Sequence, residues 1–249
     1  MSGERGKLTV LAQGARALGL HLSPAQMRAF GLYLEELLRA SPFADLTAIE
    51  DPQEVQRRHF LESLALGREL ERLGLLPEGE EVPAIDIGTG GGLPGLPLRL
   101  VWPSLRLTLL DSERRKADFL RRLLARLGLA DVQVVWGRAE EAARDPHHRE
   151  RYRLALARAV APLPVLAELG LPFLTVGGHL ASPKGERVQQ EVEEAGRALS
   201  ECGGEVVHLG PLPLPYPGPT PTLLLVRKVS PTPQRYPRRP GIPAKRPLR

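Results

Sequence analysis

The sequence of 249 residues contains no asparagine and only one cysteine, Cys202. A single cysteine excludes an internal disulfide framework and a cysteine-based zinc site. Long apolar runs are also missing, since no segment approaches the roughly 18 uninterrupted apolar residues of a membrane-spanning helix. The first seven residues are polar and lead into no apolar run of signal-peptide length. These absences predict a soluble, cytoplasmic protein with no membrane partner.

Positive charge is unevenly distributed along the chain. Eight of the 34 basic residues lie from Arg227 onward with no acidic residue among them, whereas the rest of the chain has 26 basic and 29 acidic residues. The net charge of +5 is therefore a property of the C-terminal tail. Such a block is typical of an arm that contacts phosphates, and equally of a solvated, partly disordered tail.

The length is typical of one α/β domain with extensions. Residues 1–80 are predicted to be a helical extension, in which Ser23-Pro24 and Asp51-Pro52 are helix-start signals. Residues 81–229 form the main domain, and residues 230–249 form an extended, basic, proline-rich tail. In the main domain short apolar segments alternate with helical ones. The predicted strands are Val82–Ile87, Leu105–Leu110, Val132–Trp136, Leu154–Val160, Phe173–Ala181, Glu205–Leu209 and Thr222–Lys228. The predicted helices are Pro94–Trp102, Glu113–Leu127, a short turn near Glu140, Pro164–Leu169 and Glu186–Ser200.

Strands that alternate with helices indicate a mostly parallel sheet covered on both faces. The last two strands differ, because Gly210–Pro221 contains six prolines and cannot form a crossover helix. We expect these two strands to pair antiparallel, since parallel neighbours need a long crossover. An α/β fold with a seven-stranded, mostly parallel sheet and one antiparallel strand is the architecture of the Rossmann-like class I methyltransferases.

A glycine-rich segment, Asp86-Ile87-Gly88-Thr89-Gly90-Gly91-Gly92-Leu93-Pro94-Gly95, follows the first predicted strand. Glycines at Gly88 and Gly90 let the backbone approach a ligand closely, and Pro94 is suited to the first position of the next helix. The segment also satisfies the dinucleotide pattern G-x-G-x-x-G. Asp86 favours S-adenosylmethionine instead, because its carboxylate would repel a pyrophosphate but attract the ammonium and sulfonium of that cofactor.

Two further segments follow the next strands. Asp111-Ser112-Glu113 ends the second strand, where an acid can accept the ribose hydroxyl protons of an adenosine ligand. That acid suits NAD as well, and Asp111 could simply cap a helix. Ala139 and Glu140 follow the third strand, where they could meet the adenine edge or form a solvated first helical turn.

The acceptor of the methyl group is indicated mainly by elimination. The segment after the fourth strand reads Arg158-Ala159-Val160-Ala161-Pro162-Leu163 and lacks the Asn/Asp-Pro-Pro-aromatic clamp used to methylate exocyclic amines. A pyrimidine C5 would need a cysteine nucleophile, and Cys202 lies far from any expected site loop. Guanine N7 carries a free in-plane lone pair, so positioning and electrostatics suffice. No residue is therefore assigned as a catalytic acid, base or nucleophile.

Arg158 could bond a guanine edge or a phosphate, or pair with an acid such as Glu140. Lys184, after the fifth strand, has the same two interpretations. The histidines form no metal pattern, and His59 is interpreted as a satisfied, half-buried side chain. No metal site is predicted.

Several segments together resemble a known family. They are Asp45-Leu46-Thr47-Ala48-Ile49, Asp51-Pro52, Arg58-His59-Phe60-Leu61-Glu62-Ser63-Leu64, the glycine segment with its proline, Leu109-Leu110-Asp111-Ser112, Ala157-Arg158-Ala159, Lys184-Gly185 and Tyr236-Pro237-Arg238-Arg239-Pro240-Gly241-Ile242-Pro243-Ala244-Lys245. This set is similar to the bacterial small-subunit rRNA guanine-N7 methyltransferases, also called the glucose-inhibited division protein B family. The departures are Asp45, Glu62 and Leu93, where the family often has asparagine, aspartate and an aromatic residue.

The resemblance implies methyl transfer from S-adenosylmethionine to N7 of a guanine in 16S rRNA near the decoding site. The substrate would be this rRNA, the small ribosomal subunit or its assembly intermediate, and the protein is expected to be a monomer. Three other hypotheses stay open: a small-molecule methyltransferase, a catalytically silent RNA-binding or ribosome-assembly factor, and, as the outside alternative, a nicotinamide enzyme that would bind NAD instead. The predicted cofactor-binding residues are Asp86, Gly88, Gly90, Leu93, Asp111, Ser112, Glu113, Ala139, Glu140 and Arg158. The predicted RNA-binding residues are Arg158, Lys184, Arg238, Arg239 and Lys245.

Overall fold

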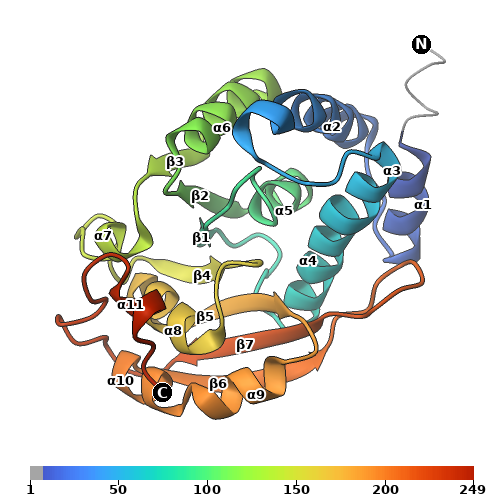
Figure 1. Cartoon of the computed structure of the whole chain (residues 1–249). Helices are drawn as coiled ribbons and strands as arrows, with labels where there is room; N and C mark the ends of the chain where they lie inside the picture. The colour runs from blue at the N-terminus through green and yellow to red at the C-terminus, as the bar shows by residue number, and fades with distance from the viewer. Residues whose placement is uncertain (1–7) are drawn as a thin grey trace.

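The computed structural model describes residues 8–249, so the first seven residues of the predicted helical extension lie outside it. Its centre is a seven-stranded sheet in the order β3-β2-β1-β4-β5-β7-β6 (Figure 1). The strands are β1 (Val82–Ile87), β2 (Leu105–Asp111), β3 (Gln133–Trp136), β4 (Tyr152–Leu156), β5 (Leu174–Lys184), β6 (Gly204–Pro211) and β7 (Thr222–Lys228).

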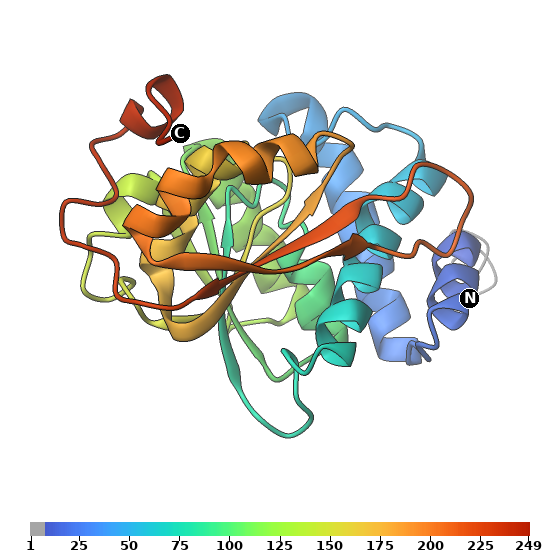
Figure 2. The same ribbon diagram turned by 90° about the horizontal axis from the view of Figure 1, so that it is seen from below.

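The direction of the strands agrees with the sequence prediction. The pairs β1·β2, β1·β4, β2·β3 and β4·β5 are parallel. Strand β7 is antiparallel to both β5 and β6, so it alone runs in the opposite direction. The connection from β6 to β7 is the proline-rich segment that the sequence excluded as a crossover helix. Figure 2 shows it reaching from the sheet toward the N-terminal helices.

Two predicted strand ends are wrong by three residues or more. Strand β4 stops at Leu156 instead of Val160, because the chain turns there and Ala159 adopts a positive φ of 57°. Strand β5 continues to Lys184 instead of Ala181, because β7 supplies antiparallel partners as far as the pair Lys184 and Thr222. Alternating apolar residues mark buried strands, but backbone pairing decides where a strand ends.

Helices cover both faces of the sheet. On one face α5 (Gly95–Val101) and α6 (Arg114–Leu127) pack with the N-terminal helices, and on the other lie α7 (Ala139–Ala142), α8 (Leu163–Gly170), α9 (Val188–Glu194) and α10 (Gly196–Cys202). Side chains of β1 alternate between the two cores, since Val82 and Ala84 belong to one and Ile85 and Ile87 to the other. The single helix predicted over Glu186–Ser200 is wrong, because the chain breaks at Ala195, just before Gly196.

The N-terminal part is helical, as predicted. It contains α1 (Thr9–Ala17), α2 (Pro24–Ala44), α3 (Pro52–Val55), a π-helix η1 (Gln56–Leu61) and α4 (Glu62–Arg72). Ser23 and Gln26 form a reciprocal capping box at the start of α2. The carboxylate of Asp51 accepts from the amides of Gln53 and Glu54, both at 2.8 Å, at the start of α3. A π-helical turn is rare and is often found at functional sites, so η1 marks a segment of interest.

The C-terminal tail folds back onto the body of the molecule instead of extending away from it. Its backbone carbonyls accept hydrogen bonds from Arg144 and Arg149 of the body, including a 2.6 Å bond from Arg144 to the Pro237 carbonyl. Prolines prevent regular pairing of this segment, but their carbonyls remain free to accept bonds from arginine. The tail ends in the short helix α11 (Ile242–Lys245), which lies beside α8 (Figure 1).

Candidate cofactor and acceptor site

The candidate cofactor loop joins β1 to α5 at the carboxyl edge of the sheet. Gly88, Gly90 and Gly92 have φ values of 64°, 57° and 97°, which L side chains rarely adopt. A Cβ added to Gly90 would meet no atom within 4 Å, so open space borders the loop there. The hydroxyl of Tyr33, in α2, donates to the Gly91 carbonyl at 2.7 Å. The loop is thus held in place on the side of α2, by Tyr33, and borders open space at Gly90. A loop that binds a ligand through its backbone needs both properties.

Asp86 lies beneath this loop rather than in front of it. Its side chain is fully buried, and one carboxylate oxygen, Oδ2, accepts from the Thr89 hydroxyl at 2.7 Å and the Gly95 amide at 2.8 Å. The other oxygen, Oδ1, is buried and has no hydrogen-bond partner among residues 8–249. Burial raises the pKa of the Asp86 carboxyl to about 7, and the two hydrogen bonds oppose that rise. Asp86 therefore holds the two ends of the loop together, while its free oxygen has unused capacity to accept a bond.

Leu93 and Pro94 close the loop. Leu93 is buried in the apolar core on the side of the N-terminal helices, and the peptide bond between these two residues is cis. Helix α5 begins at Gly95 with Pro94 as its N-cap, one residue later than predicted. Leu93 therefore anchors the loop in the core.

Asp111 connects the second strand to the loop. Its Oδ2 accepts from the Gly90 amide at 2.8 Å, and its Oδ1 accepts from the Glu113 amide at 2.9 Å. Ser112 and Glu113 are exposed beside it. The predicted alternative that Asp111 caps the helix is wrong, because the N-cap of α6 is Glu113 and no side chain caps this helix. The Asp111 carboxylate instead joins the loop to the residue that precedes α6.

The residues after the third strand lie at the carboxyl edge of the sheet, and one of them contacts the C-terminal tail. Ala139 begins α7, and the buried carboxylate of Glu140 accepts from the Gly241 amide at 2.8 Å. This bond attaches the C-terminal tail to the carboxyl edge of the sheet. Glu140 is therefore buried and bonded to the tail, so the alternative of a solvated first turn is wrong for it. The acid that pairs with Arg158 is Glu62 and not Glu140.

Arg158 lies where β4 ends, next to the loop. Because Asp86 pairs with Leu156 in the parallel register, the segment after β4, which contains Arg158, leaves the sheet at the same edge as the glycine loop. Its guanidinium donates to the Arg58 carbonyl at 3.0 Å and lies 3.6 Å from a carboxylate oxygen of Glu62. Burial lowers the pKa of Arg158, and the charges of Glu62 and Asp86 oppose this. The structure thus brings Arg158 together with the loop and with the π-helix η1.

A hydrogen-bonded cluster surrounds this arginine. The guanidinium lies 3.3 Å from Nδ1 of His59, and since arginine only donates, Nδ1 must accept. The other nitrogen, Nε2, then donates to the Thr47 hydroxyl at 2.7 Å. Burial lowers the pKa of His59 to about 4, helped by the charge of Arg158. His59 is therefore a neutral, half-buried and satisfied histidine, as predicted.

Sequence reasoning missed the other half of this cluster. The hydroxyl of Tyr216, in the connection between β6 and β7, donates to a carboxylate oxygen of Glu62 at 3.1 Å. The two residues are 154 positions apart, and no sequence pattern joins them. Their hydrogen bond ties the proline-rich connection to the start of α4.

The predicted RNA-binding residues fall into two groups. Lys184 is half-buried, and its ammonium donates to the Ala161 carbonyl at 2.7 Å and pairs with Glu191 at 2.8 Å. Arg238 donates to both carboxylate oxygens of the fully buried Glu168. Arg239 and Lys245 are exposed on the tail. The structure thus leaves the last two available to phosphates and engages the first two in the fold.

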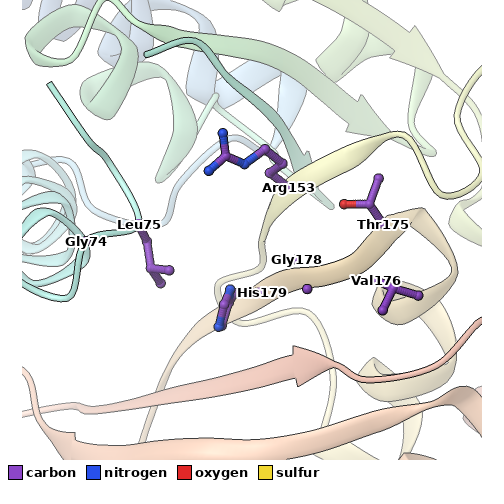
Figure 3. Close-up of a pocket in the computed structure, with 8 residues that line it drawn as sticks. Gly74, Leu75, Arg153, Thr175, Val176, Gly178 and His179 are labelled. Carbon is purple, nitrogen blue, oxygen red and sulfur yellow. The ribbon is translucent and has the colours of Figure 1, made fainter. Parts of the chain in front are cut away.

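A pocket opens at the opposite edge of the sheet, where β4 and β5 begin (Figure 3). It is lined by Arg153, His179 and the backbone around Gly177 and Gly178, with Leu75 facing them. It contains no carboxylate and no glycine loop of the kind described above, so it is distinct from the candidate site.

Within residues 8–249, no cluster of three or more histidine, cysteine or acidic side chains could hold a metal ion. No helix in the same range is long and apolar enough to cross a bilayer.

The fold defines a class of protein. The strand order, with β7 alone reversed, is that of the Rossmann-like class I methyltransferases, as predicted. A solved variant of MtNAS in complex with S-adenosylmethionine has a TM-score of 0.54 at 16% identity, with 82% of this chain and 76% of that chain covered. A Methanococcus maripaludis protein assigned as an S-adenosyl-L-methionine-dependent methyltransferase has a TM-score of 0.51 at 16% identity, covering 81% and 94%.

Sequence comparison defines the family. The model of GidB, rRNA small subunit methyltransferase G, matches residues 26–212. Ribosomal RNA small subunit methyltransferase G of Alkaliphilus metalliredigens is 41% identical over 240 residues, which cover 96% of this chain and 98% of the relative. Its namesake in Roseiflexus castenholzii is 43% identical over 234 residues, with 94% and 97% covered. The chain therefore belongs to the rRNA small subunit methyltransferase G family, which confirms the family predicted from the sequence.

Proposed function

We propose that this protein transfers the methyl group of S-adenosylmethionine to N7 of a guanine in 16S rRNA near the decoding site. The observation that carries the proposal is the family match across residues 26–212, which includes both the glycine loop and Arg158. The substrate is the rRNA itself, the small subunit or an assembly intermediate.

The loop geometry supports the cofactor. The open space at Gly90 leaves room for a ligand, and the unpartnered oxygen of Asp86 leaves an acceptor beneath it. Asp111, Ser112 and Glu113 would hold the ribose. The remaining proposed cofactor contacts are Gly88, Leu93, Ala139, Glu140 and Arg158. When bound, S-adenosylmethionine supplies an electrophilic methyl group on a sulfonium.

The acceptor chemistry needs no base from the protein. Guanine N7 attacks through an in-plane lone pair and loses no proton, so the enzyme has to orient the base and exclude water. Arg158, held by the Arg58 carbonyl and Glu62, presents donors beside the loop that suit a guanine O6 or a phosphate. His59 is neutral at physiological pH and therefore adds no second positive charge next to the sulfonium.

The test of this function is methylation of 16S rRNA. In a deletion strain we expect loss of one N7-methylguanosine, located by mass spectrometry, and its return when the wild-type chain is expressed. Unchanged N7-methylguanosine would refute the target. Activity without RNA would favour a small-molecule methyltransferase. RNA binding with no cofactor binding would favour a silent assembly factor.

The cofactor site is tested separately by calorimetry with S-adenosylmethionine. We expect Asp111→Ala to weaken binding by about 1–3 kcal/mol, the range for a charged hydrogen-bond acceptor. Asp118→Ala, which removes an exposed carboxylate from α6, is the matched control and should leave binding unchanged. Wild-type affinity in Asp111→Ala would mean that this carboxylate serves only the loop and the residue that precedes α6.

A further inference from the structure

The outer face of α6 carries an unusual concentration of positive charge. This helix, Arg114–Leu127, buries Ala117, Phe119, Leu120, Leu123 and Leu124 against the sheet. Its other side is exposed and contains five arginines against one acid, Asp118. They are Arg114, Arg115, Arg121, Arg122 and Arg126. The chain before Arg227 has more acidic than basic residues, so this face differs from the body around it.

Exposed aromatic side chains lie at the N-terminal end of this face and beside its middle. Trp136, with 52% of its surface exposed, lies under the guanidinium of Arg114, whose central carbon is 5.4 Å from the ring centroid. Beside the middle of α6, Phe43, with 78% of its surface exposed, lines a hollow together with Arg39 and Arg122. Because residues 114, 118 and 122 are spaced by four, they share one side of the helix over about 12 Å. The aromatic and basic groups therefore form one continuous strip, which we call the α6 strip.

The charges of the α6 strip are only partly neutralised. Glu36 pairs with both Arg39 and Arg126, and Asp118 pairs with both Arg121 and Arg114. Two carboxylates are thus shared among four arginines. Arg115 and Arg122 make no ion pair within residues 8–249. The strip keeps an excess of positive charge at a surface that also exposes rings to water.

The α6 strip begins at the candidate cofactor site. The indole N–H of Trp136 donates to the Ser112 carbonyl at 3.1 Å, and Ser112 directly follows Asp111, which is bonded to the loop. A polymer whose reacting base lies at the loop can therefore continue along α6.

We propose that the α6 strip binds the single-stranded rRNA that flanks the target nucleotide, with phosphates on the arginines and unstacked bases on Phe43 and Trp136. Arginine binds phosphate with paired donors, and exposed rings stack on bases of any sequence. An apolar protein partner would need a contiguous hydrophobic patch, whereas here single rings are separated by charge. This inference rests on the proposed rRNA substrate and adds a surface that none of its predicted RNA-binding residues belongs to.

The double variant Arg115→Ala/Arg122→Ala tests the phosphate contacts. Binding of the protein to naked 16S rRNA is measured as a function of salt concentration. We expect the slope of log affinity against log salt to fall by up to about two units, since each lost phosphate contact removes about one. Affinity for S-adenosylmethionine should stay at its wild-type value, which also shows that the variant is folded. The control Arg16→Ala/Arg197→Ala removes two exposed arginines from α1 and α10 and should keep the wild-type slope.

Phe43→Ala tests the stacking contact. We expect weaker RNA binding by roughly 5- to 100-fold with an unchanged salt slope, because no charge is lost. If Arg115→Ala/Arg122→Ala methylates rRNA and binds it with the wild-type salt slope, the proposal that the α6 strip binds RNA is refuted, whereas the proposed function stays intact. Weakened binding to the small subunit with unchanged binding to naked rRNA would also refute RNA binding by the α6 strip, in favour of a protein partner. If the wild-type chain neither binds nor methylates rRNA, both proposals fail.

Discussion

At the scale of single residues, His59 shows how a neighbour sets a protonation state. It lies between the Arg158 guanidinium and the Thr47 hydroxyl, and its pKa is lowered from about 6.5 to about 4, first by burial and then by the arginine. A folded-state pKa below the unfolded one contributes stability that is present above about pH 6.5 and is lost as the pH falls through about 4. The site is therefore sensitive to mild acid through this one ring.

His59→Gln should remove this sensitivity. Between pH 7.5 and 4.5 we expect the wild-type chain to lose about 2–3 kcal/mol more of its free energy of unfolding than the variant does. Urea unfolding at the two pH values measures the difference. His21→Gln, at an exposed position, should behave as the wild type does. Equal pH dependence in the wild type and His59→Gln would show that the ring is not held neutral.

At the scale of elements, Gly67 allows α4 to pack closely against the end of α5, because it has no side chain. A Cβ on Gly67 would lie 2.2 Å from the ring of Trp102, which follows α5. Contacts this short require a shift of the ring or of the helix, since buried aromatic groups have little room to move. The glycine thus sets how closely the N-terminal extension approaches the methyltransferase domain.

Gly67→Ala should destabilise the chain by about 1–3 kcal/mol, although alanine is the better helix former. Gly196→Ala is the matched control, because a Cβ at this position would meet no atom within 4 Å. This substitution should stabilise α10 by up to about 1 kcal/mol, since alanine is the better helix former. Thermal unfolding of the two variants should therefore shift in opposite directions. A Gly67→Ala variant that is as stable as the wild type, or more stable, would contradict the close packing of Gly67 on Trp102.

At the scale of the whole molecule, the C-terminal tail is part of the fold. The buried ammonium of Lys228 donates to the Leu171 carbonyl at 2.8 Å and to the Thr232 hydroxyl, where the tail begins. Further along, the Arg238 guanidinium and its backbone amide both bond the Glu168 carboxylate. A buried carboxylate needs such a partner, since an unpaired buried charge is strongly destabilising.

Arg238→Met should therefore lower the free energy of unfolding by about 3 kcal/mol and expose the tail to proteases. The double variant Glu168→Met/Arg238→Met should recover most of that loss, because no unpaired charge remains. Arg239→Met, at the exposed neighbouring position, is the control. A loss no larger than that of the control would mean that the tail is held by its backbone contacts alone.

Local patterns predicted much of the fold and part of the site. Strands β1 and β7 have the predicted bounds because each is a short apolar run between clear breaks. The break between α9 and α10 and the extension of β5 were not predicted, since they depend on packing and on a partner strand. The sequence predicted that the Asp86 carboxylate faces a ligand at the end of the first strand, but its position beneath the loop depends on the Thr89 hydroxyl and the Gly95 amide that it bonds.

The sequence by itself determined the order of strands and helices, the reversed seventh strand, the glycine loop and the family. These follow from hydrophobic periodicity, proline and glycine positions and contiguous motifs, which are local properties of the chain. Only the tertiary structure decided that Tyr216 meets Glu62, that the tail folds onto α8, and that Phe43, Trp136 and the α6 arginines share one surface. Such contacts join residues distant in sequence, and long-range packing has no local signature in the chain.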